Sequence, residues 1–362
     1  MQLSDFDHLR AENKVRFIEE IVAGQKVTTV AYMIADADFW KLPMALECRG
    51  SVFDESGKCI SRTFPKFFNL NENEQTQYHN LDFTGAIFFN KKDGSMITSI
   101  VIDGNVYLKT KKSFYSDVAI DAQKNLDADT ETFTIWLSGY GLTPIYEYTS
   151  PDNKVVINYG DTPAFTLLAV VDNETGKYLE HYVLIELITE RFPFGGLKIP
   201  IIETYDITIE EALSQREYLE GIEGWVCLLQ DGTRVKIKTE WYRRNHHLQT
   251  DLTYRDIAEM VADETLDDMK AEIAAEGINL DIVLQIEKEV TNAILTIIDD
   301  VEKLVSIADG WTDKETALMY SKHWLFSLLM KQRNKKEPAY GEFWKKRFLK
   351  NYSTRSIYNK NF

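Results

Sequence analysis

The hydrophobic patterning of this 362-residue chain changes character near residue 245, and this change constrains the fold more than any other feature of the sequence. Before that point, short segments rich in β-branched and aromatic residues alternate with turns. Four turns end in glycine, as hairpin turns between antiparallel strands do; they lie at 54–57, 103–104, 173–176 and 231–232. A helix is expected to open the chain, with Ser4 as its N-cap. Its apolar side would hold Leu9, Phe17, Ile18, Ile21 and Val22.

After Tyr242 the strand signals fade, and apolar residues recur at helical spacing. One such stretch holds Ile282, Leu284, Ile286, Val290, Ile294, Ile297, Ile298, Val301 and Val305, and a second holds Ala317, Trp324, Leu325, Leu328 and Leu329. The pattern predicts an α+β fold. We expect residues 1–245 to form a domain of antiparallel sheets with flanking helices, and residues 246–362 to form an all-helical domain.

Composition excludes several classes of protein. No apolar run approaches the roughly 20 residues that span a bilayer, and the acidic N-terminus lacks the apolar core of a secretory signal. Cys48, Cys59 and Cys227 are too scattered for a zinc site and too few for a disulfide framework. We therefore expect a soluble protein of a reducing cytoplasm, without a membrane partner.

The formal net charge of -16 argues at first against a nucleic-acid partner. The charge is uneven, however. Between Lys322 and Phe362 there are 11 Lys/Arg and 2 Asp/Glu, whereas the rest of the chain carries 30 basic and 55 acidic residues. A basic end on an acidic body is compatible with a nucleic-acid contact, although the solvated face of a terminal helix would give the same pattern.

The segment from Ile87 to Ser95 carries the strongest chemical signal. An apolar, aromatic strand runs into the polar turn Lys91-Lys92-Asp93-Gly94. A lysine at the end of such a strand can reach a cleft while its backbone stays rigid, and crowding by Lys92 would help it lose its proton and act as a nucleophile. Two solvated lysines in a hairpin turn are the alternative, which this tetrapeptide alone does not exclude.

Further charged residues lie on predicted strands of the same domain. Lys236 and Lys238 flank Ile237, so period two places both ammonium groups on one face, where they suit a polyphosphate. An edge strand protected by lysines is the alternative. Glu147 and Glu223 each sit in an otherwise apolar or aromatic segment and need a partner there, such as hydrated Mg²⁺, a ribose hydroxyl or a lysine in a structural ion pair.

Taken in order, Lys91-x-Asp93-Gly94, Glu147, Glu223-Gly224-x-Val226 and Lys236-x-Lys238 resemble the motifs of the covalent nucleotidyltransferase superfamily. The segments 46–50, 66–72 and 236–242 are similar to those of the bacteriophage RNA ligase 1 family. This resemblance implies an ATP-grasp-like ligase domain. DNA ligases and capping enzymes follow their last lysine strand with a β-barrel, and the helical pattern after residue 245 does not match one.

The resemblance also implies residue roles. Lys91 would attack the α-phosphate of ATP and become lysyl-AMP, Glu147 and Glu223 would organise the ribose and the water shell of Mg²⁺, and Tyr242 would serve the sealing step. The ATP-binding set implied is Tyr32, Arg49, Lys66, Lys111, Glu147, Lys236 and Lys238. Asp267, or its neighbour Asp268, would contribute to the metal site.

An ATP-dependent RNA ligase is therefore the function that the sequence predicts. RNA, in particular a nicked tRNA anticodon loop, would be its partner, and the helical domain with its basic, aromatic end would provide RNA specificity. The resemblance further implies RNA repair by a monomer in the cytoplasm, which for a bacteriophage protein is that of the host. A DNA ligase, a capping-type enzyme and a catalytically silent RNA-binding protein remain the alternatives.

Overall fold

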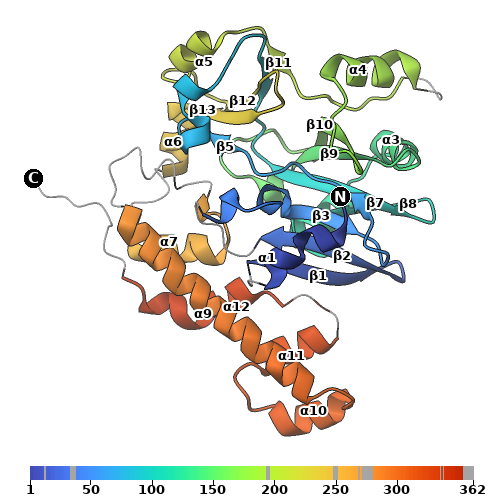
Figure 1. Ribbon diagram of the computed structural model, residues 1–362, viewed down its shortest axis with the longest axis vertical. Coiled ribbons are helices and arrows are strands. Elements are labelled where there is room, and N and C mark those ends of the chain that lie inside the picture. The colour runs from blue at the N-terminus through green and yellow to red at the C-terminus, as the bar shows by residue number, and fades with distance from the viewer. Residues whose placement is uncertain are drawn as a thin grey trace, which may run out of the picture. The chain divides into compact units, whose positions relative to one another are not determined.

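The computed structural model divides into two compact units, Met1–Arg244 and Asn245–Phe362. It describes residues 1–11, 14–32, 38–192, 196–247, 252–267, 270, 280–334, 336 and 338–353. The first unit holds all the sheets named below, and the described part of the second unit is helical (Figure 1). The α+β class with a helical C-terminal region is thus confirmed. None of the described helices is long and apolar enough to cross a bilayer.

The first sheet contradicts the helix expected at the N-terminus. Leu3–Phe6 (η1) and Asp7–Ala11 (α1) are helical, but the next segment is a strand. The sheet order is β1 (Val15–Val22), β2 (Gln25–Tyr32), β3 (Arg49–Phe53) and β4 (Cys59–Ser61), all antiparallel. Val22 pairs with Gln25 across Ala23-Gly24, both at positive φ. This two-residue turn closes a hairpin, and the β-branched residues before it favour a strand.

The second sheet has the order β10 (Ala164–Asp172), β9 (Leu142–Thr149), β7 (Ser95–Ile102) and β8 (Asn105–Lys109), again antiparallel. Helices α2 (Asp117–Lys124) and α3 (Ala128–Ser138) lie between β8 and β9 in the sequence. Residues of α3 form a buried cluster with residues of β7, β9 and β10. That cluster includes Ile97, Phe133, Tyr146 and Leu167, all fully buried. Its packing fixes β9, the strand that carries Glu147.

The third sheet has the order β11 (Thr204–Tyr205), β6 (Ile87–Asn90), β12 (Gly224–Leu228), β13 (Arg234–Lys238) and β5 (Phe68–Asn69). The β13–β5 pair is parallel and the others are antiparallel. Phe88, Trp225, Val235 and Ile237 form its buried core. Because β13 lies between β12 and β5, its lysines do not protect an open sheet edge.

The remaining elements of the first unit are short. They are α4 (His181–Glu186), the π-helical turn η7 (Leu187–Arg191), α5 (Ile209–Gln215) and the single turns η2 (Phe39–Lys41), η3 (Ala45–Glu47), η4 (Glu74–Thr76), η5 (Tyr78–Asn80) and η6 (Pro151–Asn153). The predicted glycine turns at 54–57, 103–104 and 231–232 connect β3 to β4, β7 to β8 and β12 to β13. The hairpin prediction is therefore confirmed at these three positions.

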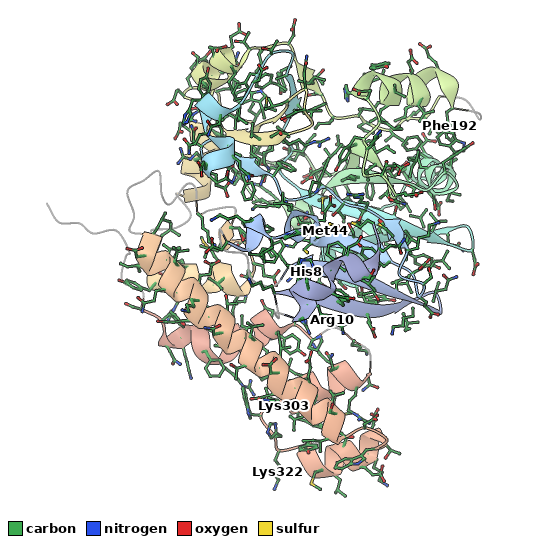
Figure 2. All side chains as sticks on the ribbon, in the orientation of Figure 1. His8, Arg10, Met44, Phe192, Lys303 and Lys322 are labelled. Carbon is green, nitrogen blue, oxygen red and sulfur yellow. The ribbon has the colours of Figure 1, made fainter. Side chains whose placement is uncertain are left out.

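The described part of the second unit is built around one long helix. That helix is α9 (Leu280–Ile307). In chain order, the other helical elements from the boundary onward are α6 (Glu240–His247), α7 (Tyr254–Ala262), α10 (Asp313–Tyr320), α11 (Phe326–Arg333), α12 (Tyr340–Phe348) and η8 (Leu349–Asn351). Ile286, Val290 and Val301 line the buried side of α9, as their spacing predicts. Leu284, which was expected on the same side, is exposed instead, and Val283 is buried. Thr253 and Thr312 cap α7 and α10 with capping boxes. Lys303 and Lys322 mark the solvated surface of this unit (Figure 2).

Candidate active site

The site is built around Lys91, which directly follows strand β6. Its backbone N–H donates to the carbonyl of Gly224, 2.9 Å away, so the residue stays attached to β12. Its Nζ lies 2.6 Å from Oε1 of Glu223, and its side chain is 20% exposed. The alternative of a freely solvated turn lysine is thus excluded, and a nucleophile candidate lies beside a buried carboxylate.

Glu223 links Lys91 to β13, the lysine strand, which carries Lys236 and Lys238. Its side chain is 4% exposed, and its Oε1 is also 3.8 Å from Nζ of Lys238. Gly224 makes this approach possible: its φ is +145°, and an added Cβ would come within 2.0 Å of the Ile237 carbonyl. Only glycine avoids that overlap. Two lysines thus converge on one carboxylate because two strands pack without a side chain between them.

The lysines of β13 lie on the face that the alternation predicts. Ile237 is buried in the core, while Nζ of Lys236 lies 5.3 Å from the Phe67 ring centre and Nζ of Lys238 lies 5.5 Å from that of Tyr242. Aromatic faces attract cations without neutralising them as carboxylates do. Lys236 and Lys238 thus lie on one face of β13, beside aromatic rings, and the Lys238 ammonium also lies 3.8 Å from the Glu223 carboxylate.

Glu147 reaches the same place from the second sheet. Its Oε1 accepts a hydrogen bond from the backbone N–H of Gly94, 3.1 Å away. Burial raises the pKa of Glu147 to about 8; the charges of Glu223 and Asp93 act in the same direction and that of Lys91 acts against it. An added Cβ on Gly94 would come within 2.5 Å of the Tyr148 carbonyl. The Lys-x-Asp-Gly turn is therefore held against β9.

Asp93 organises this turn, a role that the sequence interpretation missed. Its Oδ1 accepts a hydrogen bond from the Tyr242 hydroxyl at 2.7 Å, and its Oδ2 accepts from the backbone N–H groups of Val156 and Ile157, both at 2.8 Å. Tyr242 is buried. The available signal was the position of Asp93 inside the motif, because a carboxylate next to a strand end commonly binds backbone N–H groups.

The sequence suggests that the ammonium group of Lys92 repels that of Lys91, but the Lys92 side chain turns elsewhere. Its Nζ lies over the Tyr159 ring, 4.3 Å from the centre. The Tyr159 hydroxyl in turn accepts a hydrogen bond from the backbone N–H of Asp93 at 3.0 Å. Lys92 is thus turned toward Tyr159, while Glu223 contacts Lys91 and the charge of Lys91 acts on Glu147.

A second group of predicted residues gathers at the ends of β2, β3 and β8. Nζ of Lys111 donates to the hydroxyl of Tyr32 at 3.0 Å and lies 4.4 Å from its ring centre. The buried Lys109 donates to the carbonyls of Gly50 and Lys111. At Gly50, an added Cβ would come within 2.0 Å of the Lys111 carbonyl. The strand that begins with Arg49 and the turn that carries Lys111 are thus locked together.

Arg49 and Lys66 are the remaining predicted phosphate ligands. Nε of Arg49 is buried and makes no hydrogen bond to the described residues, which leaves donor capacity for an anion. Lys66 is buried, with Nζ 5.5 Å from the Trp40 ring centre and 5.4 Å from that of Phe68. Both cations belong to the same sheet-rich unit as Lys91, and each is a candidate phosphate ligand.

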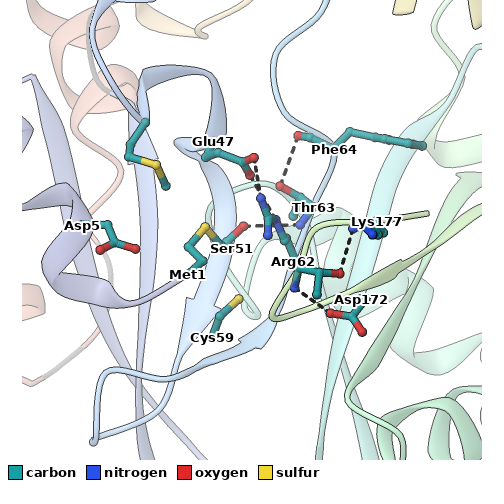
Figure 3. Close-up of polar contacts among 12 residues, drawn as sticks. Met1, Asp5, Glu47, Ser51, Cys59, Arg62, Thr63, Phe64, Asp172 and Lys177 are labelled. Carbon is teal, nitrogen blue, oxygen red and sulfur yellow. Dashed lines mark hydrogen bonds and ion pairs between the residues drawn. The ribbon is translucent and has the colours of Figure 1, made fainter. Parts of the chain in front are cut away.

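Arg234 extends the lysine strand by two more residues and was not singled out from the sequence. Its guanidinium lies 4.1 Å from the Tyr178 ring centre and 5.1 Å from that of Phe64, and burial lowers its pKa. Beside this cluster, Arg62 forms a 2.7 Å ion pair with Glu47 (Figure 3). The same period-two alternation that indicated Lys236 and Lys238 also points to Arg234.

The predicted metal ligands are only partly brought together. The described residues contain no cluster of three acids, cysteines or histidines that would bind a metal directly. Glu147 and Glu223 nevertheless repel each other at Lys91, and a hydrated divalent cation between such acids would relieve that repulsion. Asp267 belongs to the helical unit and Asp268 lies outside the described residues, so their part in a metal site stays a prediction.

Comparison with known proteins identifies the family of this chain. The family model described as RNA ligase matches residues 47–242, more than half of the chain and the stretch from η3 to Tyr242. The chain belongs to the RNA ligase family. Lys91, Glu147, Glu223, Lys236, Lys238 and Tyr242 lie within the matched stretch, whereas Tyr32 and Asp267 lie outside it.

Individual relatives of the RNA ligase family cover different shares of the chain. A provisionally named RNA ligase of Thermovibrio ammonificans is 32% identical over 239 residues, which are 64% of this chain and 61% of that protein. RNA ligase 1 of bacteriophage TS2126 is 25% identical over 282 residues, 74% of this chain and 68% of the phage protein. The chain thus spans about three fifths of the Thermovibrio protein.

Likeness to solved structures is more distant. A provisionally named ATP-dependent DNA ligase from Aquifex aeolicus aligns with a TM-score of 0.48 and 15% identity, over 82% of this chain and 79% of its own. The assignment to the RNA ligase family therefore rests on the sequence match.

Proposed function

We propose that this protein is an ATP-dependent RNA ligase that joins RNA 5′-phosphate and 3′-hydroxyl ends through a covalent adenylate on Lys91. One observation carries the proposal: segments far apart in the chain meet at Lys91. Oε1 of Glu223 lies 2.6 Å from Nζ of Lys91 and 3.8 Å from Nζ of Lys238. Glu147 approaches from another sheet. Membership of the RNA ligase family supports the same chemistry.

The first reaction is nucleotidyl transfer to the enzyme. The Lys91 ammonium loses a proton, for which the contacting Glu223 carboxylate is an acceptor. Nζ then bonds to the α-phosphorus of ATP, and the bond from that phosphorus to the pyrophosphate oxygen breaks. A neutral amine is required for this attack, and lysine supplies it more readily than arginine.

The surrounding residues position the nucleotide and offset its charge. Lys236, Lys238, Arg49, Lys66 and Lys111 would contact the phosphates, with Tyr32 beside Lys111. In-line displacement at phosphorus depends mainly on such positioning and charge neutralisation. Glu147 and Glu223 would hold Mg²⁺ through its water shell, where the metal would neutralise charge on the phosphates.

Two transfers to RNA complete the proposed cycle. A 5′-phosphate oxygen takes the adenylate from Lys91, and a 3′-hydroxyl then attacks the activated 5′-phosphate and displaces AMP. Tyr242 is assigned to this last step and is held by Asp93. We infer a broken single-stranded end, such as a nicked tRNA loop, as substrate. RNA repair by a monomer in the cytoplasm, that of the host if a bacteriophage encodes the chain, completes the proposal.

Mass spectrometry of the protein after incubation with ATP and Mg²⁺ tests this function directly. We expect a gain of one AMP that maps to the peptide containing Lys91. Lys91→Ala should abolish the gain, and Lys92→Ala, the neighbouring lysine turned toward Tyr159, should retain it. Adenylate on another residue would refute the assignment of Lys91. Labelling from GTP alone would favour a capping-type enzyme, and no labelling would favour a silent RNA-binding protein.

A further inference from the structure

A groove of about 800 Å³ opens in the helical unit, and the catalytic proposal does not use it. It runs along α9 and is closed by α12 and the residues that follow α12. Five aromatic side chains line it: Tyr254, Trp324, Trp344, Phe348 and Tyr352. All the lining residues belong to the described part of one compact unit, so the groove is a feature of that unit alone.

The aromatic rings of the groove form a continuous row. Ring centres are 6.3 Å apart between Trp324 and Phe348, 6.4 Å between Phe348 and Trp344, and 5.6 Å between Trp344 and Tyr352. Trp344 is almost fully buried, whereas Trp324 is 43% exposed. The ring planes are inclined to one another by 86°, 41° and 59°. The row therefore presents separate ring faces, and a single exposed face can stack against another flat ring.

The rim of the groove supplies a hydrogen-bond acceptor. Glu289 of α9 accepts a hydrogen bond from the Gln285 amide at 2.9 Å, and no lysine or arginine among the described residues forms an ion pair with it. Together with burial, its charge raises the pKa of Tyr352. Glu289 therefore shares the lining of the groove with the aromatic rings, and it forms no ion pair with a lysine or arginine of the described residues.

Among the described residues, no lysine or arginine lines the groove, but cations lie beside it. Arg347 donates to the carbonyl of Trp324 at 3.2 Å and covers the ring of Phe343 at 4.2 Å. Lys346 and Lys350 of the same turns are exposed. A ligand with an amine-bearing aromatic ring and an attached phosphate would match this distribution, with its ring in the groove and its phosphate at the basic rim.

We propose that this groove binds one unpaired guanine of the RNA substrate. The base stacks on one ring face of the row, and Glu289, which also lines the groove, accepts hydrogen bonds from the adjacent N1–H and N2–H₂ groups. Among the four RNA bases only guanine presents two neighbouring donors that match both oxygens of a carboxylate. The inference rests on the proposed RNA ligase function and adds a base preference to it.

Equilibrium binding of short single-stranded oligoribonucleotides to the full-length protein tests the proposal. The probes are identical uridine-rich strands that carry one central guanosine, inosine or uridine. We expect guanosine to bind about ten-fold more tightly than uridine, with inosine between them because it lacks N2–H₂. Glu289→Gln should erase this preference, and Trp324→Ala should weaken binding of all three probes about ten-fold or more.

Matched controls and an RNA-free assay keep the outcomes separate. Glu302→Gln, an exposed acid further along α9, and Leu318→Ala, an exposed apolar residue of α10, should leave binding unchanged. Self-adenylation with ATP and Mg²⁺, in the absence of RNA, should be normal in every variant. If the wild-type protein itself failed to become adenylated, the ligase function would be refuted rather than the guanine site. Equal affinity for the three probes, or a dimer that Trp324→Ala dissociates, would overturn the guanine assignment.

Discussion

At the scale of single residues, the site is defined by charges that are not independent. Glu223 contacts Lys91 and approaches Lys238, and it also contributes to the raised pKa of Glu147. A change at one of these positions therefore alters the electrostatic surroundings of the others. Substitutions that preserve shape are the most informative tests.

Glu147→Gln is expected to stabilise the nucleotide-free protein in a pH-dependent way. The pKa of Glu147 is raised from 4.5 to about 8 in the folded state, so between these values the folded protein holds a proton that the unfolded chain has lost. Wild-type stability consequently falls as pH rises through this window. Glutamine cannot ionise, so the variant does not lose this stability. Its free energy of unfolding should exceed that of the wild type by about 1–3 kcal/mol near pH 8, and by less at pH 5.

Thermal melts at pH 5 and pH 8, without nucleotide or divalent cation, measure this difference. Glu203→Gln removes an exposed acid and should melt with the wild type at both pH values. An advantage of Glu147→Gln that did not grow with pH would contradict the burial of this carboxyl group. The variant should also lose adenylation.

Tyr242→Phe should separate the two halves of the reaction. The substitution keeps the buried ring beside Lys238 but removes the hydroxyl that binds Asp93 at 2.7 Å. Asp93 retains two backbone hydrogen bonds, so the turn should persist. We expect AMP transfer to Lys91 to continue and sealing of pre-adenylated RNA to fall about ten-fold, as the loss of one charge-assisted hydrogen bond allows.

Single-turnover assays of the two steps provide the measurement for Tyr242. Tyr205→Phe, on edge strand β11 of the sheet that contains β6 and β13, is the matched control and should change neither step. If Tyr242→Phe sealed pre-adenylated RNA at the wild-type rate, its assignment to ligation would be wrong.

At the scale of elements, glycines determine how closely the strands of the site approach. Gly224 lies against the backbone of β13, and Gly94 against that of β9. These contacts set the distance between Glu223 and the lysine strand and between the Lys91 turn and Glu147. The sequence shows the glycines, but only the strand pairing shows which backbone each one meets.

Gly224→Ala should destabilise the protein far more than an alanine at a turn tip. Its Cβ would overlap the carbonyl of Ile237 at 2.0 Å, whereas at Gly232, which also has positive φ, an added Cβ meets nothing within 4 Å. Gly232→Ala therefore carries only the backbone cost of about 1 kcal/mol. We expect Gly224→Ala to cost at least twice as much in urea denaturation and to abolish adenylation. Equal losses would contradict the close packing of β12 on β13.

At the scale of the whole molecule, charge is segregated along the chain. The last 41 residues carry a net excess of 9 positive charges, while the remainder carries an excess of 25 negative charges. RNA binding should therefore depend on the basic end and weaken as salt concentration rises, since each neutralised phosphate of a single strand contributes a slope of about 0.7 in log K against log salt.

The double variant Lys346→Glu/Lys350→Glu tests this dependence, because both side chains are exposed. We expect weaker RNA binding, a shallower salt slope and unchanged self-adenylation, which needs no RNA. Lys177→Glu, an exposed cation of the first unit, is the control. An unchanged slope would show that RNA does not meet the basic end.

Much of the fold was predictable because its signals are local. Turn glycines marked three hairpins, and apolar spacing marked α9. The error at β1 has a physical cause: Val15–Val22 can place apolar residues on one side of either a helix or a strand, and its pairing with β2 decides the matter. Arg234 and Asp93 were missed because their significance depends on rings and backbone groups contributed by distant segments.

The sequence by itself determined the order of the reactive motifs, the alternation that places Lys236 and Lys238 on one face, and the division into a sheet-rich and a helical part. These properties follow from residue type and from spacing over a few positions. Only the tertiary structure decided that Glu223 contacts Lys91, that Lys92 turns to Tyr159, and that Tyr242 binds Asp93, 149 positions away. Contacts between such distant residues depend on how separate strands pair, which no local pattern encodes.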